Sequence, residues 1–237
     1  MMQLTNRLQT IANELSPSES CADIGTDHGY LPLYLYEENP ERKIIFSDVS
    51  EGSLNKAAEN CKTAYPDVDF DLRLGSGLRV LEPGEVDSVV MAGMGGNLMA
   101  ELILDDVEKS WTYKKFILQP RSHIGRIRFH LLYNSFSIIN EQLVREGGFI
   151  WPIITAVPKE IAIPSKVDED DIEFEYPRSL LDFRNDLTGE YLDNALQIET
   201  QKYEGMQKSD KLTARQRIRQ EYRIQYLGIL IKELAAK

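Results

Sequence analysis

The stretch Ser20-Cys21-Ala22-Asp23-Ile24-Gly25-Thr26-Asp27-His28-Gly29-Tyr30 decides the fold of this chain. Its first five residues are mostly small or apolar, which predicts a short buried strand, and the two glycines that follow precede a helix-length segment. In an open α/β sheet, the turn after the first strand lies where a ligand approaches the backbone closely, and glycine permits that approach. The stretch therefore predicts a ligand-binding turn between a first strand and a first crossover helix.

Beyond this turn, short apolar runs alternate with helix-length segments, a pattern typical of parallel strands joined by crossover helices. The last two runs are separated only by Arg145-Glu146-Gly147-Gly148, which predicts an antiparallel hairpin. Five parallel strands followed by a hairpin match the class I methyltransferase variant of the Rossmann-like α/β sheet better than the dehydrogenase variant with six parallel strands. The candidate strands are residues 20–24, 43–47, 69–74, 86–91, 115–119, 136–144 and 149–157.

The chain is predicted to have three parts. Residues 1–160 hold all the candidate strands and form the ligand-binding, catalytic domain. Prolines and the acidic run DEDDIEFE then break the pattern, which indicates an acidic linker over residues 161–176. Residues 177–237 show no strand signal but carry apolar side chains at helical spacing, which predicts a small α-helical C-terminal domain folded as a helical hairpin or coiled coil.

Composition and charge limit the functional classes. The 237 residues carry a formal net charge of −11, which disfavours nonspecific adhesion to nucleic acid, but the balance is −13 over residues 1–175 and +2 over residues 176–237. No run of about 18 apolar residues occurs, so we expect no membrane span. Cys21 and Cys61 lack the spacing of metal ligands, which favours buried, reduced thiols in a cytoplasmic protein without a metal.

The acidic residues of the first turn indicate the kind of ligand. A dinucleotide fingerprint places a glycine where Asp27 stands, and a carboxylate at that point would repel a pyrophosphate by roughly 1 kcal/mol at 4 Å even in water. S-adenosylmethionine has no phosphate and carries a sulfonium and an amino group, so Asp23 and Asp27 suit it. A glycine turn that binds no nucleotide is the structural alternative.

A second motif, Ser47-Asp48-Val49, ends the second candidate strand. An acidic residue about 20 residues beyond the glycine turn accepts hydrogen bonds from ribose hydroxyls in nucleoside-cofactor sites. Asp48 therefore predicts a ribose contact. The alternative is that Asp48 caps the following helix, although Ser50 can fill that role instead.

Two more glycine loops follow the third and fourth candidate strands, Gly75-Ser76-Gly77 and Gly93-Met94-Gly95-Gly96. Both lie on the same edge of the predicted sheet, because parallel strands end together. Three glycines among four residues leave room for a flat base or a cofactor to approach the backbone. After the fifth strand, Arg121 adds a cation to the same edge.

Together these motifs resemble the TrmK family of bacterial tRNA (adenine(22)-N1)-methyltransferases. The matching segments are Ala22 to Tyr30, Ser47 to Val49, Gly75 to Leu78 and Ala92 to Gly96, and the hairpin, linker and helical C-terminus agree with the family plan as well. Ser76 departs from the family, in which an acid is common at that position, and this departure weakens an expected contact to the adenine amino group of the cofactor.

The resemblance implies methyl transfer from S-adenosylmethionine to N1 of an adenine in tRNA, at position 22. The target base must be unpaired or flipped, because N1 is engaged in a normal base pair. For catalysis it implies Asp27 or His28 beside the cationic product and room at Gly95 and Gly96. The residues that it implies for the cofactor are Asp23, Gly25, Thr26, Gly29, Tyr30, Asp48, Val49, Gly75, Ser76, Gly93 and Met94.

The expected macromolecular partner is tRNA, bound by a monomer or a homodimer. On a helix, the basic residues near the C-terminus form either a phosphate-facing stripe or an ordinary solvated surface. Two rival functions stay open: a methyltransferase of the same fold that acts on another RNA, a protein or a small molecule, and a non-catalytic nucleic-acid-binding module. The arginines expected to contact tRNA are Arg215, Arg217, Arg219 and Arg223, with Arg121, Arg126 and Arg128 as the alternative surface.

Overall fold

The computed structural model describes residues 3–159, 168–208 and 212–236. Its centre is a seven-stranded sheet of order β3-β2-β1-β4-β5-β7-β6, in which the first five strands are parallel and β7 runs antiparallel to both β5 and β6. The predicted sheet of five parallel strands and an antiparallel hairpin is thus confirmed. The strands are β1 (Cys21–Ile24), β2 (Ile44–Asp48), β3 (Asp71–Leu74), β4 (Ser88–Gly95), β5 (Lys115–Ser122), β6 (Phe136–Glu146) and β7 (Phe149–Pro158).

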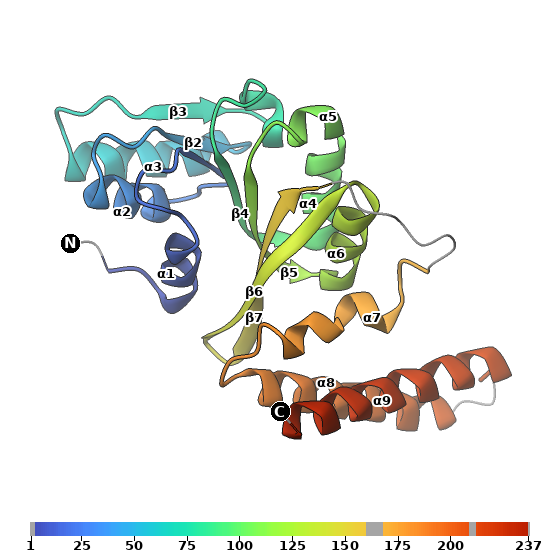
Figure 1. The fold of residues 1–237 in the computed structure, drawn as a ribbon. Coiled ribbons are helices and arrows are strands. Elements are labelled where there is room, and N and C mark those ends of the chain that lie inside the picture. The colour runs from blue at the N-terminus through green and yellow to red at the C-terminus, as the bar shows by residue number, and fades with distance from the viewer. Residues whose placement is uncertain (1–2, 160–167, 209–211, 237) are drawn as a thin grey trace.

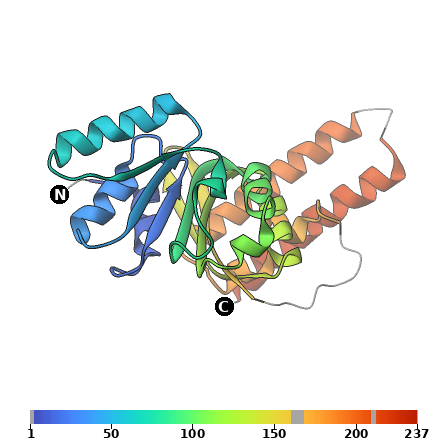
Figure 2. The ribbon, with the colours of Figure 1, turned by 90° about the horizontal axis from the view of Figure 1, so that it is seen from above.

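Helices cover both faces of this sheet (Figures 1 and 2). One face carries α1, α2 and α3, and the other carries α4 and α6. The helices of this part of the chain, which also include a short 3-10 helix η1 and the short helix α5, have the following bounds: α1 (Asn6–Asn13), α2 (Tyr30–Glu38), α3 (Glu51–Ala64), η1 (Gly77–Val80), α4 (Gly96–Leu104), α5 (Val107–Ser110) and α6 (Ile124–Tyr133).

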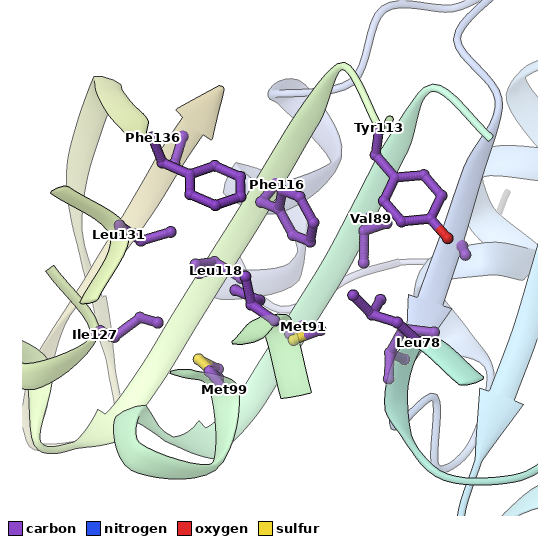
Figure 3. Packing of buried hydrophobic residues seen from close by; sticks show 14 of the residues in the cluster. Leu78, Val89, Met91, Met99, Tyr113, Phe116, Leu118, Ile127, Leu131 and Phe136 are labelled. Carbon is purple, nitrogen blue, oxygen red and sulfur yellow. The ribbon is translucent and has the colours of Figure 1, made fainter. Parts of the chain in front are cut away.

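The side chains of the central strands alternate between the two faces. Val89 and Met91 of β4 pack under α4 and α6, whereas Val90 between them packs on the opposite face. Because both faces are covered, the middle of β4 is apolar over three successive residues, Val89 to Met91, as is typical of parallel sheets. Figure 3 shows the α4/α6 side, where the rings of Phe116 and Phe136 meet edge to face with centroids 5.6 Å apart.

The N-terminal helix α1 is fixed to the hairpin of β6 and β7. The Glu14 carboxylate, at the end of this helix, accepts hydrogen bonds from Asn140 (2.8 Å), Gln142 (2.6 Å) and Thr155 (2.6 Å). The first residues of the chain are thereby held against strands that lie more than 120 residues later in the sequence.

The C-terminal helices form an antiparallel hairpin beneath β6 and β7 (Figure 1). Of the two predicted alternatives, the structure therefore has the helical hairpin. Leu143 of β6 belongs to the same buried cluster as Leu192 and Leu227 of the hairpin, so the helices share a core with the sheet. The predicted linker lies outside the described residues up to position 167, and its remainder is partly helical. The C-terminal elements are α7 (Ile172–Glu175), the 3-10 helix η2 (Arg178–Leu181), α8 (Thr188–Gln207) and α9 (Ala214–Ala235).

Candidate active site

A cavity of about 620 Å³ opens where β1, β2, β3 and β4 end, and we call it the main cavity. Its volume lies in the usual range for a small-molecule or cofactor site. The start of α1 closes one side of it. Ten of the eleven residues predicted to hold the cofactor line this cavity: Asp23, Gly25, Thr26, Tyr30, Asp48, Val49, Gly75, Ser76, Gly93 and Met94.

Two glycines of the first turn have different tasks. Gly25 has a φ of +80°, its N–H donates to the Ser47 carbonyl (2.8 Å), and a Cβ there would lie 2.3 Å from the Met94 methyl group. Gly29 is also left-handed, but a Cβ there would face Phe46 and Ala57 in the core. Gly29 lies outside the lining of the main cavity, and its close packing against β2 and α3 explains this glycine, so its contact with the cofactor stays a prediction.

Asp23 is a buried carboxyl group at the floor of the main cavity. Burial raises its pKa to about 6, and the nearby Asp48 carboxylate acts in the same direction. The Thr26 hydroxyl and the Arg7 guanidinium oppose this rise in the pKa. A cationic group placed beside Asp23 would favour its ionised form, which suits this position to a positively charged ligand.

Asp48 is held rigidly at the end of β2. Its carboxylate accepts hydrogen bonds from the main-chain N–H groups of Ser50 (2.8 Å) and Asp27 (3.2 Å). The cap of α3 is Ser50, whose hydroxyl accepts from the Ser53 N–H, so the alternative reading of Asp48 as a helix cap is wrong. Each carboxylate oxygen has a second lone pair, and Asp48 can therefore still accept two hydroxyl groups from a ligand.

Asp27, His28 and Tyr30 form the mouth of the main cavity. Asp27 has a φ of +47°, an uncommon conformation for a residue with a side chain, and its exposed carboxylate lies 3.6 Å from His28 Nε2 and 3.7 Å from Lys56 Nζ. The rings of His28 and Tyr30 stack with centroids 5.2 Å apart. The mouth thus offers a carboxylate beside an aromatic surface.

The glycine loop after β4 is only partly at the site. Gly93, with a φ of +78°, lines the main cavity beside Arg121, whose Nε lies 3.8 Å from where a Cβ would be. Gly95 and Gly96 lie outside the cavity lining, and a Cβ on Gly96 would lie 2.4 Å from the His123 carbonyl oxygen. The start of α4 packs against the turn after β5 at this point, which explains Gly96, and the catalytic role of Gly95 and Gly96 stays a prediction.

One polar residue of the site, Arg7, was missed from the sequence. Arg7 lines the main cavity, donates to Glu146 (2.7 Å) and also donates to the side-chain oxygen of the buried Gln119 (3.1 Å). The same Gln119 oxygen accepts from the Gly93 N–H (3.2 Å). The sequence held no signal for this network, because its members lie 26 to 139 residues apart and Arg7 occupies an ordinary position in an amphipathic helix.

The arginines of the alternative tRNA surface separate into three environments. Arg121 lines the main cavity, and Arg126 forms ion pairs with Glu169 (2.6 Å) and Asp170 (2.7 Å). Arg128 is 1% exposed and is paired with the equally buried Glu141, so its predicted contact with tRNA is wrong. A buried pair of this kind cannot be opened to reach a phosphate without leaving a carboxylate unpaired in the core.

The four arginines of α9 also differ. Arg215 and Arg217 are exposed, with no ion pair among the described residues. The guanidinium nitrogen Nη2 of Arg219 lies 3.6 Å from the Asp168 carboxylate oxygen Oδ2. Arg223 is largely buried and bonded to Glu199 (2.8 Å) and Glu175 (2.6 Å), which makes it a structural residue and corrects its assignment to tRNA.

Within the described ranges, no cluster of three or more His, Cys, Asp or Glu side chains could hold a metal ion. No helix in that part of the chain is both long and apolar enough to cross a bilayer. Cys21 and Cys61 are free and buried, as predicted.

Comparisons with known proteins agree with this geometry. Residues 4–154 match the family model described as a methyltransferase domain. The tRNA (adenine(22)-N(1))-methyltransferase of Bacillus subtilis is 31% identical over 155 residues, and the match spans 65% of this chain and 65% of that relative. The crystal structure of the B. subtilis m1A22 tRNA methyltransferase TrmK superposes with a TM-score of 0.76 and 25% identity over 99% of each chain.

A further solved structure has the same fold. TrmK of M. capricolum, solved with S-adenosyl-homocysteine, superposes with a TM-score of 0.78 and 22% identity, and the superposition covers 98% of this chain and 99% of that one. The match thus extends over the sheet and the C-terminal helices alike. Since the family model covers more than half of the chain and its motifs line one cavity, the chain belongs to the methyltransferase-domain family and, within it, to the TrmK family of tRNA (adenine(22)-N1)-methyltransferases.

Proposed function

We propose that this chain transfers the methyl group of S-adenosylmethionine to N1 of adenine 22 in tRNA, in the cytoplasm. The observation that carries this proposal is a main cavity with three carboxylates, those of Asp23, Asp27 and Asp48, at the edge of the sheet where Rossmann-like proteins bind nucleoside cofactors. Those carboxylates disfavour a pyrophosphate and favour a cationic cofactor. Similarity to the B. subtilis enzyme supports the choice of substrate.

The residues present fit the methyl donor. Asp48 is positioned to accept both ribose hydroxyls, and the absence of a side chain at Gly25 makes room for the Met94 methyl group at the wall of the main cavity. Val49, 73% exposed beside Asp48, offers an apolar surface to the adenine. The buried Asp23 would hold the cationic part of the donor. When bound, this cofactor supplies an electrophilic methyl group on a sulfonium.

The residues at the mouth act on the adenine of the tRNA. Methylation at N1 would leave the adenine ring cationic. The Asp27 carboxylate stabilises this charge and can accept a proton from the exocyclic amine, with His28 as the alternative acceptor. The exposed Tyr30 ring provides a stacking surface for the flipped base.

Positioning accounts for much of the expected rate, because well-oriented reactants gain roughly 7–11 kcal/mol over reactants that meet at random. Arg121 lies beside Gly93 at the cavity wall and can bind a phosphate next to the target nucleotide. Residues 1–160 form the catalytic domain in this proposal. The hairpin of residues 177–237 binds tRNA through the exposed Arg215 and Arg217.

The deciding experiment is incubation of the protein with S-adenosylmethionine and an unmodified tRNA transcript, followed by nucleoside mass spectrometry. We expect one 1-methyladenosine per tRNA, and none in a matched transcript with guanine at position 22. Methylation of another molecule or nucleotide instead would show that the chain is a methyltransferase of the same fold with a different substrate. If the protein binds tRNA but does not bind the methyl donor, it is a non-catalytic nucleic-acid-binding module.

A further inference from the structure

A second cavity, of about 500 Å³, lies between the start of α6, the acidic run 168–175 and the hairpin of α8 and α9. We call it the charged cleft, and we call residues 168–175 the acidic strap. Six of the eight strap residues are Asp or Glu. Arg126, Arg219 and Arg223 line the cleft opposite these carboxylates.

The first half of the acidic strap neutralises two arginines on different elements. Arg126 of α6 is bonded to Glu169 (2.6 Å) and Asp170 (2.7 Å). Arg219 of α9 donates to the main-chain oxygen of Asp170 (2.9 Å) and lies 3.6 Å from the Asp168 carboxylate. The acidic strap thus bridges the catalytic sheet region and the C-terminal hairpin through exposed ion pairs.

The second half of the strap is anchored by apolar contacts. Ile172 is 1% exposed in the cluster shared with the hairpin, and the Phe174 ring packs edge-on against Phe129 with centroids 5.2 Å apart. Glu175 meets the largely buried Arg223. This half is a fixed part of the fold, and it tethers the more exposed first half beside the arginines.

The exposed pairs differ from the buried ones in how readily another anion can replace them. The side chains of Arg126, Asp170, Arg219 and Asp168 are 31%, 50%, 48% and 54% exposed. Ion pairs with such exposure contribute little to stability and are screened by salt. A phosphate can take the place of these carboxylates at the same guanidinium groups without exposing a buried charge.

The position of the charged cleft relates it to the substrate. Arg121 lines the main cavity, whereas His123 and Arg126 line the charged cleft, so one short connection from β5 to α6 serves both. An RNA chain that delivers a nucleotide into the main cavity and continues toward the hairpin passes Arg126 and then Arg219. These two cations are already occupied by the acidic strap.

We propose that the acidic strap is an intramolecular competitor for RNA phosphates, which tRNA displaces from Arg126 and Arg219 as it binds. The inference rests on the proposed function. Binding is then an exchange of carboxylates for phosphates, which a single small anion cannot drive but a long, correctly shaped polyanion can. The strap reduces the affinity for every RNA and reserves the cleft for those that also engage the main cavity and the hairpin.

The test is a comparison of two variants with equal charge. The strap variant is Glu169→Gln/Asp170→Asn, and the control variant is Asp193→Asn/Glu204→Gln, which neutralises two exposed acids of α8 that have no arginine partner among the described residues. Affinity for unmodified tRNA transcript and for an unrelated RNA hairpin is measured by filter binding. The strap variant should bind both about threefold to tenfold more tightly than the control variant does at low salt, with the difference fading toward 1 M salt.

A second pair of variants, made in a protein that lacks both arginines, separates competition by the strap from the general effect of net charge on RNA affinity. In a protein that carries Arg126→Gln and Arg219→Gln, the strap substitutions should change affinity no more than the control substitutions do. The proposal is overturned if the strap variant and the control variant gain equal affinity for RNA when Arg126 and Arg219 are intact. It is also overturned if the strap variant keeps its melting temperature but binds RNA more weakly than the unmodified protein. Absence of methyl transfer to tRNA by the unmodified protein would instead count against the proposed function.

Hydrogen exchange tests the displacement without any substitution. The Asp170 N–H donates to the Asp168 carboxylate and the Asp171 N–H to the Asp168 carbonyl, which protects both amides while the strap is in place. Saturating tRNA should speed their exchange, and the amide of Tyr176 in the anchored part should not change. Slower exchange at residues 170 and 171 would show that RNA binding keeps the strap in place, contrary to the proposal.

Discussion

The Asp48 carboxylate combines two roles that a single substitution can separate. It accepts two main-chain hydrogen bonds, from Asp27 and Ser50, and its remaining lone pairs face the main cavity. A hydrogen bond to a charged group is worth roughly 1.5–3 kcal/mol. The residue therefore both shapes the loop and, in the proposed function, holds the ribose.

Asp48→Ala should weaken S-adenosylmethionine binding by at least about tenfold, as measured by isothermal titration calorimetry. Ser50→Ala is the matched control, because it removes the true cap of α3 and should cost roughly 1 kcal/mol of stability with little effect on affinity. Equal affinities for the Asp48 variant and the control would show that the ribose lies elsewhere.

Asp23 predicts a pH dependence of stability. Its pKa is raised to about 6 in the folded state, and an unfolded aspartate titrates near pH 4. Between these values the folded chain holds a proton that the unfolded chain has lost. The contribution of Asp23 to the free energy of unfolding is therefore complete below about pH 4 and is lost as the pH rises to about 6. Asp23→Asn should remove that slope, which amounts to at most about 3 kcal/mol in urea unfolding.

The matched control is Asp27→Asn, the same change at an exposed carboxyl of the same loop. Its unfolding free energy should keep the wild-type fall between pH 4 and 6. If the Asp23 variant keeps that fall as well, another group is responsible for it.

At the scale of elements, the sequence predicted all seven strands. The apolar runs of β1, β2, β4 and β5 follow from burial on both faces, whereas β3 at the edge of the sheet is exposed or half-buried. The structure extends β4 and β5 beyond their predicted ends, to Gly95 and Ser122, where irregular pairing joins polar and glycine residues that carry no strand signal. Glycine loops were located correctly at the carboxyl edge. The sequence cannot tell a glycine that admits a ligand from one such as Gly96 that admits a neighbouring backbone.

Helix α1 is an element whose docking bears on the site. Glu14→Ala removes the acceptor for three side chains of β6 and β7 and should lower the free energy of unfolding by about 2–4 kcal/mol in urea. Because Arg7 at the start of the same helix lines the main cavity, affinity for S-adenosylmethionine should fall as well. Asn13→Ala, an exposed change at the end of the same helix, is the control. Unchanged affinity in the destabilised variant would separate α1 from the cofactor site.

At the scale of the whole molecule, the family prediction is confirmed by the comparisons, while the assignment of arginines needed the structure. A basic side chain on a helix looks the same in sequence whether it faces a phosphate or a carboxylate. Arg128 and Arg223 meet Glu141, Glu175 and Glu199, and two of these acids lie on elements more than 20 residues away from their partners. Such pairings depend on tertiary structure, which local periodicity does not encode.

The exposed arginines of α9 therefore carry the prediction for tRNA. Arg215→Glu/Arg217→Glu should weaken tRNA binding and flatten the slope of log affinity against log salt by about 0.7 to 0.9 for each lost phosphate contact. Affinity for S-adenosylmethionine should stay unchanged, because the cofactor site lies at the sheet. An unchanged salt slope would remove these residues from the tRNA surface. Lys232→Glu, near the opposite end of α9, controls for the effect of charge alone.

In the proposed function, the buried carboxyl of Asp23 also couples occupancy of the main cavity to the uptake and release of a proton. At pH 6 this group is about half protonated, and a cationic ligand beside it stabilises the carboxylate, so binding expels a proton into the buffer. The heat of binding at that pH then depends on the buffer's enthalpy of ionisation, and the dependence fades at pH 8. Occupancy by the methyl donor accordingly falls when the surroundings acidify, even at constant donor concentration.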